Sequence, residues 1–419
     1  METVLGIKNL SLEDQLLTLV ARTSLDGNAR KRFRELLSNK LDWVHILKAA
    51  KKHEIAPLLY HNLERSSNSD SVQKIFINDL KLHYHGVLSR NMLQYKELDS
   101  ILKELFKHNI KVIVLKGAAL ATTLYGNIGL RPFSDIDILV KKEDLGIVQK
   151  KIIELGYIVD PQLKSPIKKG LPVERYYMKY HPHLPPFYKR TEHSNFERRG
   201  GIFLEVHWAL TAEMLPFNID IKNVWERANE SEIAENNVLV MSNEDSLIHM
   251  CVHIARHRFS AKLREYTDIS ELCLSGIDWD YVARNVMENN IKNPVYWSLY
   301  LTKLILNADI SEDFLERIKP GHLRTSIFNS IIDIKAVIRS DTEKRKASGL
   351  IIELITIDSG VDMIRSFFRR LFPPVEWMAL RYSVSSSKKI YFYYPIRWGY
   401  LAFKAVKFPF ALLSNKGAE

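Results

Sequence analysis

The sequence predicts an α/β protein of the α+β type, in which a central domain is flanked by helical regions at both ends of the chain. Apolar residues recur at helical spacing through residues 1–95 and again through residues 241–419. Between them, residues 96–240 contain short β-branched runs that alternate with helical stretches, which is the order of a strand–helix–strand domain. A chain of 419 residues with 46% hydrophobic residues is long enough to give these regions cores of their own.

The N-terminal region, residues 1–95, is expected to be helical. Ser11 and Asp14 have the three-residue spacing of a helix N-cap. Apolar stripes follow at 41–50, 55–63 and 75–84, and we interpret their large side chains as core. No catalytic pattern occurs here, so this region is expected to be a helical layer or a partner surface.

The central domain, residues 96–240, is organised around the stretch 111–140. Residues 112–115 form an apolar run suited to a buried strand, and Lys116-Gly117 lead into an alanine-rich helix start. Pro132 and nearby glycines then mark a loop that ends at Asp135. Further strands are expected at 138–140, 157–159 and 201–208, with a helix between the first two.

Asp135 and Asp137 are the first candidate catalytic residues. Two positions apart on a strand, both carboxylates point to one face, about 6.6–6.8 Å apart along the chain. Carboxylates so placed repel each other unless a cation lies between them. Two divalent ions about 3.5–4 Å apart fit that spacing and serve phosphoryl chemistry. A solvated strand end gives the same short pattern, so the choice between a metal site and a strand end depends on the neighbouring motifs.

The predicted strand at 201–208 carries Glu205 and His207 on one face. Glu205 could supply the third ligand that a two-metal site needs. His207 could orient Glu205, touch substrate or make a structural hydrogen bond.

Residues 161–200 are rich in Lys, Arg, Pro, Tyr and His and have few periodic apolar residues. We interpret them as a basic loop within the central domain. Such a long loop is either a flap that contacts an anionic substrate or a solvated insertion, and both interpretations stay open.

The C-terminal region, residues 241–419, begins with a helix capped by Ser242. His249, His253 and His257 recur every four residues on this helix, so they share one face. A metal site is one interpretation; the others are that His253 and His257 face a cleft of the central domain or pack against that domain. Two further candidates follow on the next helix, where Arg264 and Asp268 either form an ion pair or contact phosphate and acceptor.

The tail, residues 367–413, interleaves aromatic residues with Lys and Arg. This pattern fits a packed helix with a solvated face, a helix in a membrane interface, or contact with nucleic acid. No apolar run reaches the roughly 18 residues that a spanning helix needs.

The net charge of +11 and the pI near 9.3 favour anionic partners such as nucleotides, nucleic acid or an acidic membrane surface. Cys251 and Cys273 form neither a metal-type spacing nor a disulfide framework, which suits a reducing compartment. The N-terminal residues do not read as a secretion signal. We therefore expect a cytoplasmic protein, with peripheral membrane attachment as an alternative.

An ordered set of motifs resembles the uncharacterised bacterial nucleotidyltransferase family, within the polymerase-β-like nucleotidyltransferase superfamily. The motifs are Leu115-Lys116-Gly117, then Arg131-Pro132-x-Ser134-Asp135-Ile136-Asp137, then Glu205-Val206-His207-Trp208, with further likeness at 42–43, 56–60 and 371–374. The resemblance implies a small mixed sheet with helices on one side. It also implies transfer of a nucleoside monophosphate from an NTP, such as ATP, to an acceptor.

Carried onto this sequence, the resemblance makes Asp135, Asp137 and Glu205 both catalytic residues and ligands of Mg²⁺ or Mn²⁺. The nucleotide is expected to contact Lys116, Gly117, Ala118, Arg131 and Ser134. His207, His253, Arg264 and Asp268 are expected near the substrate or behind the metal ligands. Relatives commonly have Gly-Gly or Gly-Ser at the helix opening and a shorter spacer to the first Asp, so Lys116 or Arg131 is expected to supply the missing phosphate contact.

The sequence thus predicts a metal-dependent nucleotidyltransferase with an unknown acceptor, expected to be a small molecule, sugar or peptide product rather than nucleic acid. The alternative is a catalytically weak nucleotide-binding scaffold whose tail docks a membrane or a biosynthetic protein partner. RNA modification would use the positive charge, but the sequence has no recognisable RNA-binding module.

Overall fold

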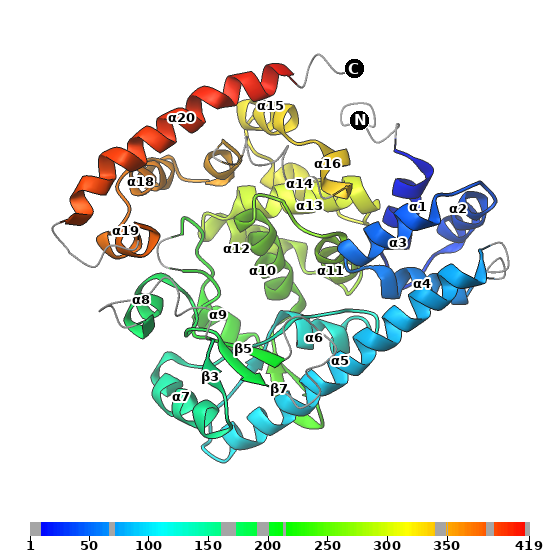
Figure 1. Cartoon of the computed structure of the whole chain (residues 1–419), viewed down its shortest axis with the longest axis horizontal. Coiled ribbons are helices and arrows are strands. Elements are labelled where there is room, and N and C mark those ends of the chain that lie inside the picture. Colours follow the sequence, from blue (N-terminus) through cyan, green and yellow to red (C-terminus); the bar gives the residue numbers. More distant parts are fainter. Residues whose placement is uncertain are drawn as a thin grey trace.

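The computed structural model describes residues 10–66, 72–160, 173–190, 201–212, 215–339, 349, 351–382 and 389–414 (Figure 1). Within these residues the chain forms a seven-stranded mixed sheet with helices before it, over it and after it. This confirms the predicted α/β fold class with flanking helical regions.

The sheet has the strand order β3-β4-β5-β2-β1-β7-β6. β1 pairs parallel with β7 and antiparallel with β2, while β2 pairs parallel with β5. The remaining neighbours are antiparallel. The strands are β1 (Ile113–Val114), β2 (Asp135–Leu139), β3 (Ile158–Val159), β4 (Phe187–Arg190), β5 (Gly201–His207), β6 (Asn229–Ile233) and β7 (Asn236–Val240). β1, β2, β3 and β5 fall where the sequence predicts strands.

The basic segment 161–200 is not simply a loop, which corrects the sequence-based interpretation. It contains α8 (Val173–Tyr180) and β4, and β4 pairs antiparallel with β5. Phe187 of β4 is completely buried, so this strand gains both backbone hydrogen bonds and a core contact from β5. Residues 161–172 and 191–200 lie outside the described part of the chain.

One face of the sheet packs against α5 (Lys74–Phe106) and α7 (Leu145–Glu154). Leu98, Ile101 and Leu105 of α5 share a core with Ile136 and Ile138 of β2. Because side chains alternate along a strand, this burial turns Asp135 and Asp137 toward the opposite face. The long helix α5 runs past the sheet in Figure 1 and crosses the boundary expected at residue 95.

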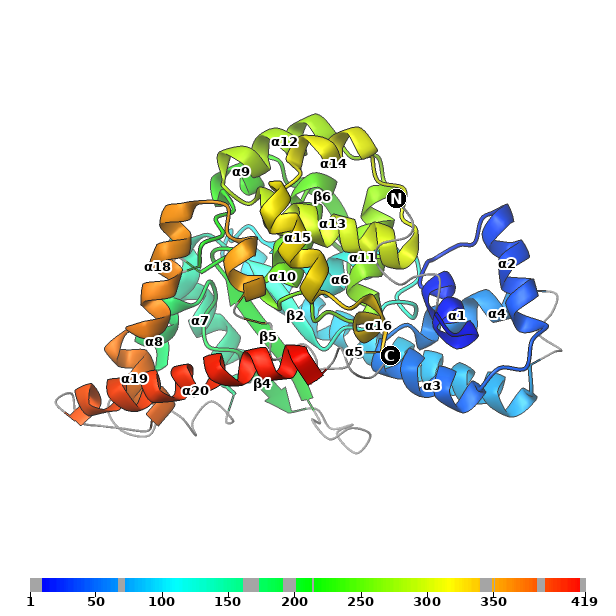
Figure 2. The same cartoon turned by 90° about the horizontal axis from the view of Figure 1, so that it is seen from above.

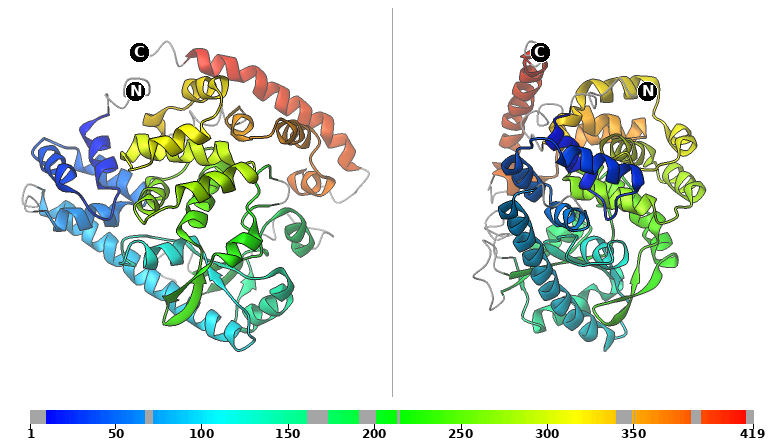
Figure 3. Two further views of the ribbon diagram at one scale, coloured as in Figure 1. Left: turned by 180° about the vertical axis from the view of Figure 1, so that it is seen from behind. Right: turned by 90° about the vertical axis from the view of Figure 1, so that its right-hand side faces the viewer.

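The opposite face of the sheet meets the helical regions. Ile113, Leu115 and Leu139 share a core with helices from both ends of the chain. Figures 1 and 3 show the N-terminal helices, in blue, beside the C-terminal helices, in green and yellow. The N-terminal helices are α1 (Leu12–Val20), α2 (Gly27–Leu37), α3 (Trp43–Lys52) and α4 (Ala56–Glu64). The C-terminal helices are α10 (Asn243–Arg256), α11 (Leu263–Cys273), α12 (Trp279–Glu288), α13 (Lys292–Leu306), α14 (Glu312–Ile318), α15 (His322–Ile331) and α16 (Ile334–Ile338).

Two helix starts follow directly from the sequence. The side chain of Ser11 accepts a hydrogen bond from the backbone N–H of Asp14, and Ser242 does the same for Asp245. These contacts satisfy N–H groups that a helix start otherwise leaves without a partner, so α1 and α10 begin where the caps predict.

The remaining elements connect the sheet to its surroundings or follow the main helical core. They are α6 (Lys116–Thr123), α9 (Ile221–Glu226), α18 (Gly360–Leu371), α19 (Val375–Tyr382) and α20 (Tyr393–Ser414), with short 3₁₀ turns at Lys142–Asp144 and Lys389–Phe392. Among the described residues, no helix combines the length and apolar character that crossing a bilayer requires.

The loop that leads into β2 is held by buried polar contacts. The side-chain amides of Asn91 and Gln94 on α5 donate to the backbone carbonyls of Arg131 and Phe133, each at 2.9 Å. The Arg131 guanidinium donates two hydrogen bonds to Asp268 of α11, at 2.8 and 2.7 Å. Tyr125 donates to the same carboxylate at 2.8 Å. The loop is therefore fixed to helices on both sides of it.

This ion pair corrects two expectations. Arg131 was expected at the phosphates and Asp268 near the acceptor, but their side chains are 1% and 0% exposed. A carboxylate that accepts a bidentate guanidinium in the interior has little capacity left for substrate. Arg131 and Asp268 therefore position the loop, and neither lines an open site.

We expect Arg131→Met to lower the free energy of unfolding by about 3–5 kcal/mol, because it leaves the Asp268 carboxylate buried without its cation. The double variant Arg131→Met/Asp268→Leu should regain most of that loss. Urea unfolding followed by circular dichroism measures both. The control is Arg317→Met, which removes an exposed ion pair with Asp280 and should cost no more than about 1 kcal/mol. Equal losses in Arg131→Met and Arg317→Met would contradict a supporting role for the buried pair.

Candidate active site

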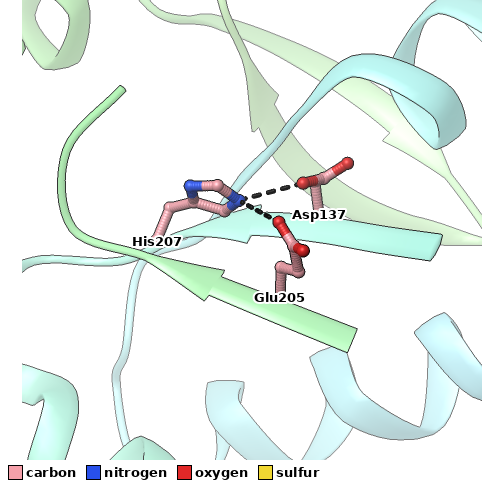
Figure 4. Close-up of side chains that lie close together, drawn as sticks. All are labelled: Asp137, Glu205 and His207. Carbon is pink, nitrogen blue, oxygen red and sulfur yellow. Dashed lines mark hydrogen bonds and ion pairs between the residues drawn. The ribbon is translucent and has the colours of Figure 1, made fainter. Parts of the chain in front are cut away.

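Parallel pairing of β2 and β5 builds the centre of the candidate site. The register sets Asp137 opposite Glu205 and Leu139 opposite His207. Figure 4 shows the side chains of Asp137, Glu205 and His207 converging from the two strands on one face of the sheet. Residues far apart in sequence thus meet because two neighbouring strands run in the same direction.

The three side chains contact one another through His207. Its Nε2 lies 2.9 Å from Asp137 Oδ1 and 3.3 Å from Glu205 Oε2 (Figure 4). One potential ligand atom from each residue lies within 4.8 Å of the other two. In the part of the chain that the structure describes, this is the one group of His, Cys, Asp or Glu side chains with the spacing of a metal site.

Lys116 adds a cation to this cluster from the start of α6. Its Nζ lies 3.1 Å from Asp137 Oδ1, the same oxygen that His207 contacts. The backbone of Lys116 has φ of +41°, a left-handed conformation that costs a side-chain-bearing residue about 1–3 kcal/mol. The surrounding structure therefore holds Lys116 in a strained position, as often occurs at functional sites.

Asp135 lies at the first position of β2, where the Ser134 hydroxyl donates to Asp135 Oδ1 at 2.8 Å. Burial and the negative charges of Asp137 and Glu205 raise the pKa of Asp135 to about 6. The charges of Asp137 and Glu205 therefore act on Asp135, although Asp135 does not belong to the close group of Asp137, Glu205 and His207. The structure brings together Asp137 and Glu205 from the predicted metal set and adds His207, which the sequence placed in a supporting role.

The charges of the cluster compensate one another in the interior. Burial acts to raise the pKa of Asp137, but Lys116 and His207 outweigh it and hold the pKa of that carboxyl well below its usual range. Burial acts to lower the pKa of His207, and its hydrogen bonds to Asp137 and Glu205 raise it instead. The acidic residues are thus stable together only because cationic groups lie among them.

The chemistry of these donors fits a divalent cation. Carboxylate oxygens are the ligands that Mg²⁺ and Mn²⁺ prefer, and Asp135, Asp137 and Glu205 supply them from one face of the sheet. His207 is suited either to donate a ring nitrogen or to orient the two carboxylates that it contacts. The raised pKa of Asp135 reports negative charge that such an ion would neutralise.

Gly117 and Ala118 serve the packing of α6. A Cβ atom on Gly117 would lie 2.5 Å from Cβ of Phe133, so only glycine allows the loop before β2 to approach the helix. Ala118 is buried, and its carbonyl accepts a hydrogen bond from Tyr95 at 2.7 Å. Leu115 precedes α6 and provides no capping side chain, so α6 presents an uncapped helix N-terminus next to Lys116.

Two imidazoles that the sequence analysis missed lie beside His207. The ring of His183 is 5.1 Å from that of His207, and the ring of His181 is 5.4 Å from that of His183. Burial and the neighbouring His183 lower the pKa of His181 to about 4. The His-Pro-His sequence at 181–183 was a signal for them, but the interpretation of this segment as a loop concealed its proximity to β5.

Helix α10 contributes further histidines and an arginine to the surroundings of the cluster. Burial lowers the pKa of His249 well below its usual value, and His253 lies 3.4 Å from Glu265. His249, His253 and His257 do not form a metal group among the described residues. Partial desolvation lowers the pKa of Arg256, and the charge of Glu205 opposes that shift, so this unpredicted cation lies within electrostatic reach of the site.

Arg264 forms the ion pair with Asp268 that was one of its two expected roles, but a second carboxylate lies closer. Its Nε lies 2.8 Å from Glu54 of the N-terminal region, and its distance to Asp268 is 4.0 Å. The side chain therefore links α11 to the segment between α3 and α4 rather than contacting the carboxylate cluster.

A cavity of about 720 Å³ lies beyond the ends of β2 and β5, and none of Asp135, Asp137, Glu205 and His207 lines it. Its wall includes His181, Trp208 and Trp225, so it lies next to the imidazole row. Five lysines and two glutamates also line it: Lys111, Lys141, Lys142, Lys179, Lys222, Glu143 and Glu226. A volume of this size fits a small organic molecule, and the excess of lysine favours an anionic one.

Comparison with known proteins gives one family. The model of a family described as an uncharacterised nucleotidyltransferase matches residues 39–307. These residues include β1 to β7 and α3 to α13. No match was found among curated proteins.

The geometry predicts which side chains hold a divalent ion. We expect Asp137→Asn, Glu205→Gln and His207→Gln each to weaken Mn²⁺ binding about tenfold or more, as measured by the electron paramagnetic resonance signal of free Mn²⁺. Glu154→Gln, an exposed carboxylate on α7, is the matched control and should bind as the wild type does. Asp135→Asn is expected to weaken binding as well, and unchanged Mn²⁺ binding in Asp137→Asn or Glu205→Gln would contradict a metal site at this cluster.

The pKa of His181 predicts a pH effect on stability. Its folded-state pKa of about 4 lies below the ordinary value of 6.5, so the unfolded chain binds the extra proton more readily. The stability that neutral His181 contributes is therefore complete above pH 6.5 and is lost as the pH falls toward 4. Between these pH values, Tm of the wild type should fall by about 3 °C more than that of His181→Gln. Exposed His322→Gln should follow the wild type, and a parallel fall in all three proteins would refute the assignment.

Proposed function

The chain belongs to the uncharacterised nucleotidyltransferase family, and from this premise we propose that it transfers a nucleoside monophosphate from an NTP to an acceptor. The observation that supports the proposal most strongly is the convergence of Asp137, Glu205 and His207 next to Asp135. A family match to a transferase and a cluster of carboxylates suited to divalent ions point to the same chemistry.

In the proposed reaction, an acceptor oxygen forms a bond to the α-phosphorus while the bond to the bridging oxygen of pyrophosphate breaks. Pyrophosphate leaves, and the acceptor hydroxyl gives its proton to a base, for which we propose the Glu205 carboxylate. Asp135, Asp137 and Glu205 would hold Mg²⁺ or Mn²⁺, with His207 orienting Asp137 and Glu205. The bound ions would polarise the phosphoryl group and neutralise the charge of the leaving group.

Residues of this chain supply the remaining positive charge around the nucleotide. Lys116 lies at the uncapped N-terminus of α6, a combination that attracts phosphate. Arg256 adds a second cation within reach of Glu205. We assign the triphosphate to this side of the cluster, where Ser134 is also exposed.

The acceptor is proposed to enter from the cavity beside Trp208 and Trp225. Its volume of about 720 Å³ suits a small molecule, a sugar or the end of a peptide product better than a folded nucleic acid. The lysines around it favour an acceptor that carries negative charge.

A second candidate function is a nucleotide-binding scaffold with weak or no catalysis. The contact between Lys116 and Asp137 favours it, because an ammonium group there neutralises a carboxylate that would otherwise bind metal. Ala118 in place of the usual glycine or serine at the helix opening also favours it.

Calorimetric titration with each of the four NTPs in the presence of Mg²⁺ tests the proposal. We expect one or more NTPs to bind the wild type, and Asp137→Asn to weaken that binding about tenfold or more because the metal that bridges protein and phosphate is lost. Glu154→Gln is the control and should retain the wild-type affinity.

The outcomes separate the two functions. Binding that survives Asp137→Asn would support the scaffold and contradict the metal-dependent transferase. Binding that is lost in Asp137→Asn would name the donor, and release of pyrophosphate from that NTP in the presence of candidate acceptors would then measure turnover.

A further inference from the structure

Exposed apolar side chains are concentrated at one end of the chain. Among the described residues, 22 large hydrophobic side chains are exposed, and 11 of them lie between residues 361 and 403. We call this set the C-terminal apolar surface. It consists of Val361, Ile364, Phe367, Phe368, Phe372, Tyr391, Phe392, Ile396, Trp398, Tyr400 and Phe403. Isolated exposed apolar residues are normal, but a cluster of this size marks an interaction surface.

The exposed residues follow helical spacing. On α18, Val361, Ile364 and Phe368 lie three and four positions apart, which puts them on one face. Near the start of α20, Phe392, Ile396, Tyr400 and Phe403 repeat the same pattern. Each helix therefore turns an apolar stripe outward, which is the reverse of a helix that packs on a core.

An aromatic contact joins the two helices. The rings of Phe372 and Trp398 meet edge to face at 5.3 Å, and the Trp398 indole N–H donates to the carbonyl of Leu371 at 2.9 Å. Figures 1 and 2 show α18, α19 and α20 gathered at one end of the molecule, with α20 along its outer edge. The apolar stripes are thus held in place by the structure.

The same part of the chain is strongly basic. Between residues 360 and 414 the sequence has nine Lys and Arg residues and two carboxylates, so this segment carries a net +7 of the total +11. Both carboxylates are already paired, Asp362 with Arg365 at 3.0 Å and Glu376 with Lys179 at 2.9 Å. The partner of the surface therefore has to be apolar and negatively charged at once.

We propose that the C-terminal apolar surface binds the interface of an anionic lipid bilayer without crossing it. Outward Phe, Trp, Tyr and Ile side chains with interspersed Arg and Lys are the features of a helix that lies in the headgroup region. Pairing with a second copy through the same surface would bring two net charges of +7 together, which opposes association. The aliphatic Val361, Ile364 and Ile396 suit acyl chains better than they suit stacked bases.

The helix between the two stripes, α19, contacts an element that leads to the candidate active site. Glu376 of α19 contacts both Lys179 and Tyr180 at the end of α8, each at 2.9 Å. His181 and His183 follow α8 in the chain, and the ring of His183 lies next to those of His181 and His207. Lipid binding by the C-terminal apolar surface does not depend on the proposed function.

Co-sedimentation of the full chain with large unilamellar vesicles tests the proposal. We expect binding to vesicles of phosphatidylcholine mixed with phosphatidylglycerol, at least tenfold weaker binding to phosphatidylcholine alone, and loss of the difference at high salt. Ile396→Glu and Phe368→Glu should each weaken the binding about tenfold or more. Leu82→Glu on α5 is the matched control, because Leu82 is an exposed apolar residue far from this surface in sequence, and it should bind like the wild type.

Several results would overturn the proposal. The first is no binding to the mixed vesicles, or equal loss of binding in Leu82→Glu and Ile396→Glu. The second is a dimer in solution that Ile396→Glu converts to a monomer, because the surface would then be covered by a second copy. The third is an affinity for single-stranded RNA that equals the vesicle affinity and is lost in the same variants.

Discussion

The repulsion among three carboxylates is the constraint on which the candidate site depends. Parallel pairing of β2 with β5 sets Asp137 opposite Glu205, and Asp135 precedes them on the same face. Such a cluster is unfavourable in a partly buried position unless cations neutralise it. Lys116 and His207 do so here, both at Asp137 Oδ1, while the pKa of Asp135 still rises to about 6 through burial and its acidic neighbours. Lys116 and His207 therefore neutralise Asp137 without a metal ion. The raised pKa of Asp135 indicates remaining negative charge, which favours a further cation.

The rest of the fold holds this charge cluster in position. Asn91 and Gln94 on one side, and the buried pair of Arg131 and Asp268 on the other, fix the loop that delivers Asp135. Gly117 lets that loop approach α6 closely enough to put Lys116 beside Asp137. Gly117, Arg131 and Asp268 were expected at the substrate, but their contacts in the structure determine where the carboxylates of the cluster lie.

The surroundings of the cluster divide into regions of different chemistry. Lys116, the start of α6 and Arg256 offer positive charge near the cluster, and the cavity lined by lysines and tryptophans lies beyond the ends of β2 and β5. The C-terminal apolar surface is separate from both, but Glu376 ties it to α8 and so to the imidazoles beside the site. Donor, acceptor and anchoring surface would thus be arranged around one sheet.

The sequence by itself determined the features that depend on neighbouring residues. Strand 112–115, the caps Ser11 and Ser242, and the shared face of Glu205 and His207 follow from spacing along the chain, because propensity and alternation are local. Only the tertiary structure decided which distant residues meet. β4 inside the basic segment depends on pairing with β5, the burial of Arg131 depends on Asp268 from α11, and the positions of His183 and Arg256 depend on helices and strands that approach from elsewhere in the chain. Such contacts are set by packing over long sequence separations, which no local pattern records.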